Sequence, residues 1–512
     1  MNLLRALVAV SGFTFVSRIL GFARDFIIAR AFGASLATDA FFVAFRLPNL
    51  LRRLFAEGAF SQAFVPMLAE QKNKSSLEEV RSLIDRTATL LFLALVLTAL
   101  LGMALAPVVV YISAPGFASD PAKFGLTVTM LRIIFPYIVF ISLVAFAAGV
   151  LNTWNRFSVP AITPALLNVS FIVGALFFAD RFDPPVLVLA WAVFGGGVLQ
   201  LAFQIPFLAK LGLLPRWRLD LHHPGVRRIL KLMGPAAFGV SISQISLVIN
   251  TIFASFLVTG SVSWLYYADR LMEFPSGMLG VALGTILLPS LSKYHADANH
   301  DEYARLLDWG LRVTVLLAVP ATVALAVLAL PLIAALFHYG RFTAEDAWMT
   351  RQALMAYSVG LVGIIMVKIL APGFYARQNI VTPVKIGILT LVATQALNLA
   401  LIGPLKHAGL ALAISLAACM NAALLYRGLR KNGSYKPAPG WPVFLLKVGA
   451  SVGFMAIVLF TTMGEAKWWL AAGWERKIPA VTGLVILGVA VYAGCLLAFG
   501  FRPRDFSRRA AG

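Results

Sequence analysis

Long apolar stretches follow one another along almost the whole of this sequence. About fourteen of them approach the roughly 20 residues that a helix needs to cross a bilayer. Because 60% of the 512 residues are hydrophobic and only 13% are charged, no soluble core could cover so much apolar surface. We therefore predict an all-α polytopic membrane protein with about 14 transmembrane helices. The approximate stretches are 6–32, 39–68, 87–112, 125–151, 158–179, 185–208, 232–257, 263–291, 313–337, 353–375, 384–402, 408–426, 443–462 and 479–501.

The distribution of basic residues predicts how these helices are oriented. The formal net charge is +21, from 43 Lys and Arg against 22 Asp and Glu. If the N-terminus is cytoplasmic and fourteen helices alternate, about 26 basic residues fall in cytoplasmic segments and about 8 in outside loops. This bias predicts that the N-terminus and the C-terminus are both cytoplasmic. It also accounts for the excess charge without nucleic acid as a partner.

The chain also repeats itself. Residues 44–47 resemble residues 268–271, and residues 65–68 resemble residues 288–291, at offsets of 224 and 223 positions. Such an offset spans six predicted helices, an even number, so the two repeats are parallel, as in many transporters. We predict two six-helix parallel pseudo-repeats around a central cavity, with two extra helices at the C-terminal end. The predicted domains are an N-terminal lobe (1–215, helices 1–6), a C-terminal lobe (216–436, helices 7–12) and helices 13–14 with a basic cytoplasmic tail (437–512).

Three of the predicted helices carry charged residues at membrane depth, where each charge costs roughly 2.5–3.5 kcal/mol. We therefore expect these residues to line a water-filled cavity. Basic residues outnumber acids there, which favours an anionic substrate, and the planar guanidinium group is suited to phosphate. The predicted cavity residues are Arg18, Arg24, Asp25, Asp39, Arg46, Asn49, Arg52, Arg53, Glu57, Ser263, Asp269, Arg270 and Glu273.

Spacing along these helices predicts two ion pairs. Arg18 and Asp25, seven residues apart, share a helix face, and Arg53 and Glu57 are four residues apart. We expect such pairs to hold the empty cavity and to exchange partners with the substrate.

Two other classes of function are weaker interpretations. An ion-coupled exporter of small cationic compounds should present unpaired acids rather than surplus arginine. A membrane-embedded transferase or phosphatase needs an acid–base or metal constellation, and acidic loop pairs such as Glu345 and Asp346 are interpreted as solvated charges. No metal site and no cofactor are predicted. Cys419 and Cys495 are interpreted as two thiols in apolar runs, with a bridge as the alternative.

Several longer motifs resemble the MurJ (MviN) family of lipid II flippases, and together they cover nearly the whole chain. The matching segments are Ser17–Asp25, Phe32–Gly33, Thr38–Phe42, Arg46–Arg53, Glu57–Phe60, Asn152–Phe157, Ala268–Pro275 and Leu370–Tyr375. The resemblance weakens after about residue 437.

This resemblance implies a transporter of the multidrug/oligosaccharidyl-lipid/polysaccharide (MOP) exporter superfamily rather than an enzyme. It implies a V-shaped cavity lined by helices one, two, seven and eight, with a lipid groove at helices thirteen and fourteen. It further implies that lipid II, an undecaprenyl-diphosphate-linked peptidoglycan precursor, moves across the bacterial cytoplasmic (inner) membrane by alternating access for cell-wall synthesis. A flippase of another lipid-linked oligosaccharide stays open as the alternative.

The resemblance also assigns roles to residues. The family's functional arginines match Arg18, Arg24, Arg52 and Arg270, which are expected to bind the substrate diphosphate, and Asp39 and Ser263 match other sensitive positions. Coupling to the membrane potential or to a monovalent ion stays open. Membrane lipid is an expected partner, and the cell-wall synthesis machinery stays open as a further one.

Overall fold

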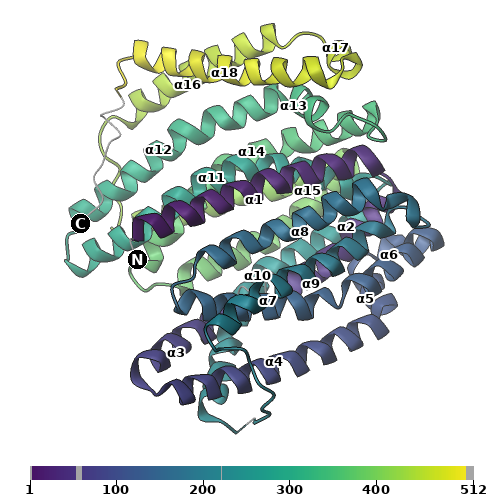
Figure 1. The fold of residues 1–512 in the computed structure, drawn as a ribbon. Helices are drawn as coiled ribbons and strands as arrows, with labels where there is room; N and C mark the ends of the chain where they lie inside the picture. Colours follow the sequence, from purple (N-terminus) through teal and green to yellow (C-terminus); the bar gives the residue numbers. More distant parts are fainter. Residues whose placement is uncertain (1–2, 53–59, 221, 503–512) are drawn as a thin grey trace. The chain divides into compact units, whose positions relative to one another are not determined.

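The computed structural model describes residues 3–52, 60–220 and 222–502, with side chains from residue 16 onward apart from 234–243, 278 and 281–286. The described residues form helices joined by short connections and contain no strand (Figure 1). The prediction of an all-α protein is therefore confirmed. The chain divides into two compact units, residues 1–262 and residues 263–512.

The first unit contains ten α-helices and two short 3-10 helices within the described residues. They are α1 (Leu3–Phe32), α2 (Leu36–Arg52), α3 (Ser61–Lys74), α4 (Leu77–Ala104), α5 (Ala106–Ser113), η2 (Pro115–Ser119), α6 (Pro121–Ile134), α7 (Tyr137–Thr153), α8 (Ser158–Phe177), η3 (Ala179–Arg181), α9 (Leu187–Lys210) and α10 (Pro224–Ser255). Helix α8 packs against α1 and α9, α2 packs against α6, and α10 packs against α3, α4, α5 and η2.

The second unit continues with eight helices in its described part. They are α11 (Ser261–Ala296), which starts at the end of the first unit, α12 (His300–Val327), α13 (Ala329–Leu336), α14 (Ala344–Tyr375), α15 (Val381–Lys431), α16 (Trp441–Thr462), α17 (Ala466–Ala471) and α18 (Trp474–Ala498). Helix α14 packs against α12 and α15, while α16 packs against α12 and α18. The backbone leaves helical geometry at Lys406 (φ 50°, ψ −126°), so α15 contains the two stretches predicted at 384–402 and 408–426.

Within the described residues, the predicted apolar stretches lie mainly on these helices. Nine helical segments of the described chain are long and apolar enough to cross a membrane. Large aliphatic side chains stand exposed on them, among them Leu97, Leu446 and Val489. Since water would leave such surfaces unstable, lipid must cover them. The chain is a multi-pass membrane protein.

Local sequence signals set the helix ends. Ser76 accepts a hydrogen bond from the Glu79 backbone N–H at the start of α4, and Asp120 accepts two from the first turn of α6. Thr343 and Asp346 form a reciprocal capping box at the start of α14. These caps place the first turns of three helices that carry residues discussed below.

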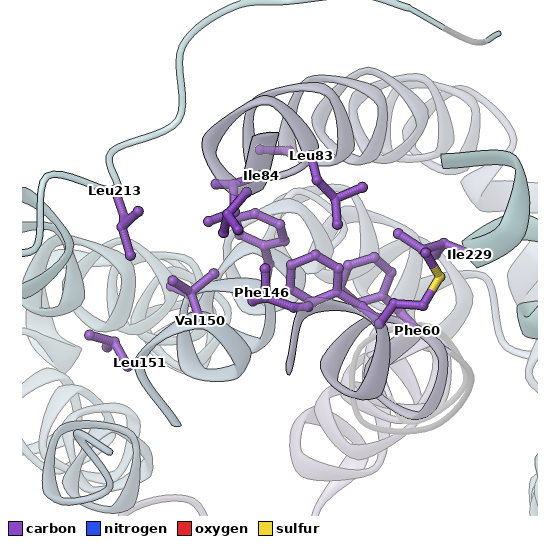
Figure 2. Packing of buried hydrophobic residues seen from close by; sticks show 14 of the residues in the cluster. Phe60, Leu83, Ile84, Phe146, Val150, Leu151, Leu213 and Ile229 are labelled. Atoms are coloured by element: carbon purple, nitrogen blue, oxygen red, sulfur yellow. The ribbon is translucent and has the colours of Figure 1, made fainter. Parts of the chain in front are cut away.

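Aromatic and aliphatic side chains of α3, α4, α7 and α10 form one apolar cluster of the first unit (Figure 2). Phe60 stacks on Phe64, whose ring stacks on Phe146 of α7. Leu213, from the segment that follows α9, is buried in the same cluster. The second unit has two such clusters, one among α11, α12, α14 and α15, and one in which α16 and α18 pack on α12 and α13.

Candidate functional site

Arg24 and Asp25 of α1 form a buried ion pair beside α8. The Arg24 Nη2 lies 2.7 Å from the Asp25 Oδ1, and Arg24 Nη1 donates to the Asn168 Oδ1 at 3.0 Å. The guanidinium also lies 5.4 Å from the centre of the Phe171 ring. Asn168 in turn donates to the backbone oxygen of Ser17 at 3.1 Å. The pair therefore joins α1 to α8 and satisfies a charge that could not be buried alone.

The predicted pairing of Arg18 with Asp25 is wrong. Asp25 is fully buried and pairs with its neighbour Arg24, whereas the Arg18 side chain is exposed. Two helical turns, about 10.5 Å of rise, separate Arg18 from Asp25, while the long Arg24 side chain reaches the adjacent carboxylate directly. Burial beside the adjacent Arg24, rather than a helix face shared with Arg18, therefore determines the partner of Asp25.

The polar residues of α2 have separate partners within the first unit. Arg46 donates from Nη1 to the Thr251 Oγ1 of α10 at 2.7 Å. Arg52 donates from Nε to the Asn49 Oδ1 at 2.8 Å, one turn earlier on the same helix. The predicted pair of Arg53 and Glu57 lies outside the described residues and stays a prediction.

Asp39 joins three segments of the first unit. Its Oδ2 accepts from the Lys123 Nζ at 2.9 Å and from the Gly260 backbone N–H at 2.8 Å. Both charged side chains are buried, and the Lys123 ammonium lies 4.3 Å from the centre of the Phe117 ring. One carboxylate therefore ties the start of α2 to the start of α6 and to the connection that follows α10.

The contact between Lys123 and Asp39 was not expected from the sequence. Asp120 caps α6 and Pro121 begins it, so Lys123 falls in the first helical turn. Only the fold brings residues 39, 123 and 260 together.

In the second unit, the predicted residues lie along α11. Arg270 Nη1 lies 2.6 Å from the Glu273 Oε2, and both side chains are partly exposed. Asp269 is exposed, and Ser263, two turns earlier, is fully buried. Arg270 and Glu273 are therefore brought together on one face of α11.

Asp346 corrects a second interpretation of the sequence, because it is not a solvated loop charge. It is buried, caps α14, and accepts from the Trp264 Nε1 at 2.9 Å. The spacing of Thr343 and Asp346 is that of a capping box and could have indicated this position. Cys419 and Cys495 are both free thiols.

No group of three or more His, Cys, Asp or Glu side chains in the described ranges could hold a metal ion. In each unit by itself, arginines among the candidate residues have polar or acidic partners and are able to bind an anion by exchanging those partners. The candidate residues of the two units are Arg18, Arg24, Asp25, Asp39, Arg46, Asn49 and Arg52 in the first, and Ser263, Asp269, Arg270 and Glu273 in the second.

Comparison with known proteins assigns the family. The family model described as "Lipid II flippase MurJ" matches residues 28–477. A curated protein of Burkholderia cenocepacia named lipid II flippase MurJ is 53% identical over 515 residues, covering 100% of both chains. The chain belongs to the MurJ family. The resemblance drawn from its motifs is therefore confirmed. A Vibrio cholerae relative named probable lipid II flippase MurJ is 42% identical and covers 98% of this chain and 97% of that protein.

Solved structures agree with this MurJ assignment. A structure titled "Lipid II flippase MurJ, inward closed conformation" superposes with a TM-score of 0.81 at 27% identity, covering 98% of this chain and 100% of that one. An inward-facing multidrug resistance MATE family transporter of the MOP superfamily superposes with a TM-score of 0.67 at 15% identity, over 83% of this chain and 98% of that one. The second match shows a shared fold alone.

Proposed function

We propose that this MurJ family member is a lipid II flippase of the bacterial inner membrane. It moves the undecaprenyl-diphosphate-linked precursor from the cytoplasmic to the periplasmic leaflet by alternating access, with both termini in the cytoplasm. The observation that carries this proposal is full-length similarity, at 53% identity, to a protein named lipid II flippase MurJ. The charged residues on helices of a membrane protein agree with it, because a large anionic head group cannot cross hydrocarbon unaided.

Four arginines are the proposed ligands of the diphosphate, namely Arg18, Arg24, Arg52 and Arg270. Three of them have partners in this structure. Arg24 contacts Asp25 and Asn168, Arg52 contacts Asn49, and Arg270 contacts Glu273. A diphosphate offers more charge and more acceptor oxygens than one carboxylate, so it can replace these partners. Partner exchange then links substrate binding to the release of contacts that hold the unloaded protein.

The ion pairs disfavour an exporter of cationic compounds. A cation needs an available carboxylate, yet Asp25, Asp39 and Glu273 each accept from a basic side chain. The membrane potential acts on such charges with about 2.3 kcal/mol per charge per 100 mV, and we propose it, or a monovalent ion, as the source of coupling. Proteins of cell-wall synthesis are proposed consumers of the exposed lipid.

Reconstitution tests this function. Vesicles of phosphatidylglycerol and phosphatidylethanolamine containing the protein and fluorescent lipid II should show translocation to the opposite leaflet, with the lipid chemically unchanged. Arg24→Ala and Arg270→Ala should abolish it, while Arg227→Ala, an exposed residue near the start of α10, should not. Translocation of a different lipid-linked saccharide in preference to lipid II, or full activity of both site variants, would contradict the proposal.

A further inference from the structure

In each half of the chain, a buried aspartate binds the backbone of the segment that follows the last helix of the repeat. Asp85 of α4 and Asp308 of α12 are 223 residues apart, the offset of the sequence repeat. The Asp85 Oδ1 accepts from the Arg216 backbone N–H at 2.9 Å, just after α9. The Asp308 Oδ1 accepts from the Ala438 backbone N–H at 3.1 Å, just after α15. Each buried carboxylate thus fixes the chain where it leaves the last helix of its repeat.

The approach to each contact is also equivalent. Helices α9 and α15 both end two residues before a glycine with φ of 67°, Gly212 and Gly433. The next buried side chain is Leu213 in the first half and Tyr435 in the second. The two segments therefore follow equivalent paths, with one additional residue between the glycine and the contact in the second half.

In the second half this region is covered by protein. Trp441, the first residue of α16, donates from Nε1 to the Asp308 Oδ1 at 2.7 Å. Arg312 pairs with Asp308 at 2.8 Å and lies against the rings of Trp441 and Phe444. Helix α16 then continues along α12, and its apolar residues pack in one cluster with those of α12.

In the first half no helix of the described chain covers the corresponding face of α4, and its leucines are exposed. Leu316, Val323 and Ala324 of α12 pack against the cluster that contains α16. The residues 223 positions earlier are Leu93, Leu100 and Leu101, with side chains 41%, 58% and 52% exposed. Nothing in the described chain takes the place that α16 has in the second half, so lipid must cover these leucines.

The cytoplasmic end of this face carries a tryptophan between two arginines. Arg216, Trp217 and Arg218 are all exposed, Trp217 at 71%. The Trp217 ring meets Phe92 of α4 edge-on at 5.2 Å between centres, and the Arg218 backbone N–H donates to the Thr89 Oγ1 at 3.0 Å. Tryptophan beside arginine is typical of the membrane–water boundary, where the ring meets the acyl chains and the cations meet phosphate.

The two nearby acids, Asp85 and Asp220, do not neutralise the three arginines at this end, Arg86, Arg216 and Arg218, so it keeps a positive charge. Asp85 accepts the Arg216 N–H and lies 3.9 Å from the Arg218 guanidinium, and Asp220 pairs with Arg86 at 3.2 Å. Both arginine side chains remain exposed beside these contacts. A second protein helix on this face would have to supply new acids, whereas an anionic lipid brings its own charge.

We propose that Leu93, Leu100, Leu101, Arg216, Trp217 and Arg218 form a binding site for an anionic phospholipid of the cytoplasmic leaflet, here called the α4 lipid site. The head-group phosphate binds the two guanidinium groups, and an acyl chain lies along the leucines in the place that α16 takes in the second half. Asp85 positions the site by fixing the backbone that presents both arginines.

Native mass spectrometry of the full-length protein tests this site. Delipidated protein is titrated with phosphatidylglycerol and with phosphatidylcholine of the same chains. We expect wild-type protein to bind phosphatidylglycerol more tightly than phosphatidylcholine. In the double variant Arg216→Gln/Arg218→Gln the ratio of the two affinities should fall roughly 25-fold, about five-fold for each arginine. Arg227→Gln, an exposed arginine outside the site, is the matched control and should retain it.

Two further variants separate this site from a general effect of charge. Asp85→Ala keeps both arginines but removes the acceptor of the Arg216 backbone N–H, so it should weaken phosphatidylglycerol binding while the melting temperature in detergent confirms folding. A photocrosslinking residue at Leu97, which is exposed on α4, should label lipid in native membranes. Equal lipid preference in the double variant and the wild type would overturn the proposal, as would crosslinking of Leu97 to a protein chain.

Discussion

Replacing Asp39 by Asn should destabilise the first unit by several kcal/mol. The Asp39 carboxylate is fully buried and accepts from the Lys123 ammonium and the Gly260 N–H at 2.9 and 2.8 Å. An asparagine oxygen can still accept one N–H, but it leaves the buried ammonium without its counter-charge. Removing one partner of such a pair costs about 3–5 kcal/mol. At about 2–4 °C per kcal/mol, the melting temperature in detergent should fall by roughly 6–20 °C.

A double-mutant cycle with Lys123→Met distinguishes this pair from general damage. Each single variant leaves one buried charge, whereas Asp39→Asn/Lys123→Met leaves none. The double variant should therefore melt above Asp39→Asn, because the uncompensated ammonium is gone. If Asp39→Asn melts within about 2 °C of wild type, or if the two losses simply add, the ion pair does not stabilise these three segments and the reasoning is refuted.

Two further predictions concern close packing and pH. Gly116 of η2 has no room for a side chain, since a Cβ there would lie 2.3 Å from the Ser255 oxygen, so Gly116→Ala should cost about 1–3 kcal/mol in a thermal melt. Gly125→Ala, in open space on α6, should be neutral or stabilising by about 1 kcal/mol, and equal losses at both positions would contradict the packing argument. Burial and the neighbouring Lys477 lower the pKa of His338 below its ordinary 6.5, so the folded protein binds fewer protons than the unfolded chain below that pH. Stability should therefore fall as the pH drops from about 7.5 to about 5.5, and His338→Asn should lessen that fall; an unchanged pH profile in the variant would exclude this histidine as its source.

Much of the fold could be predicted because helices in lipid follow simple rules of length and apolarity. The stretches at 384–402 and 408–426 were separable even though one continuous element carries both, because Pro404 and Lys406 interrupt the apolar run. The repeat offset of 223 also recurs in the paired roles of Asp85 and Asp308. The motifs from Ser17–Asp25 to Leu370–Tyr375 are together long enough to indicate the MurJ family.

The partners of the charged residues were harder to predict, because they depend on tertiary contacts between distant segments. Spacing on α1 suggested Arg18 as the ion-pair partner of Asp25. Arg24 is the partner instead, because Asn168 and Phe171 of α8 contact its guanidinium group. Lys123 carried no signal of its own in the sequence, since its role depends on Asp39 lying 84 residues earlier. A helix pattern predicts which face a charge shares, and packing decides which charges meet.

The central claim is that this chain moves lipid II across the inner membrane, with Arg270 among its ligands. The most direct measurement is the fraction of lipid II exposed on the periplasmic side of cells depleted of their own flippase and supplied with this protein. Wild-type protein should restore exposure, and Arg270→Ala, inserted at the same level, should leave lipid II in the cytoplasmic leaflet. Exposure that stays absent with wild-type protein, or that Arg270→Ala restores fully, would contradict the account.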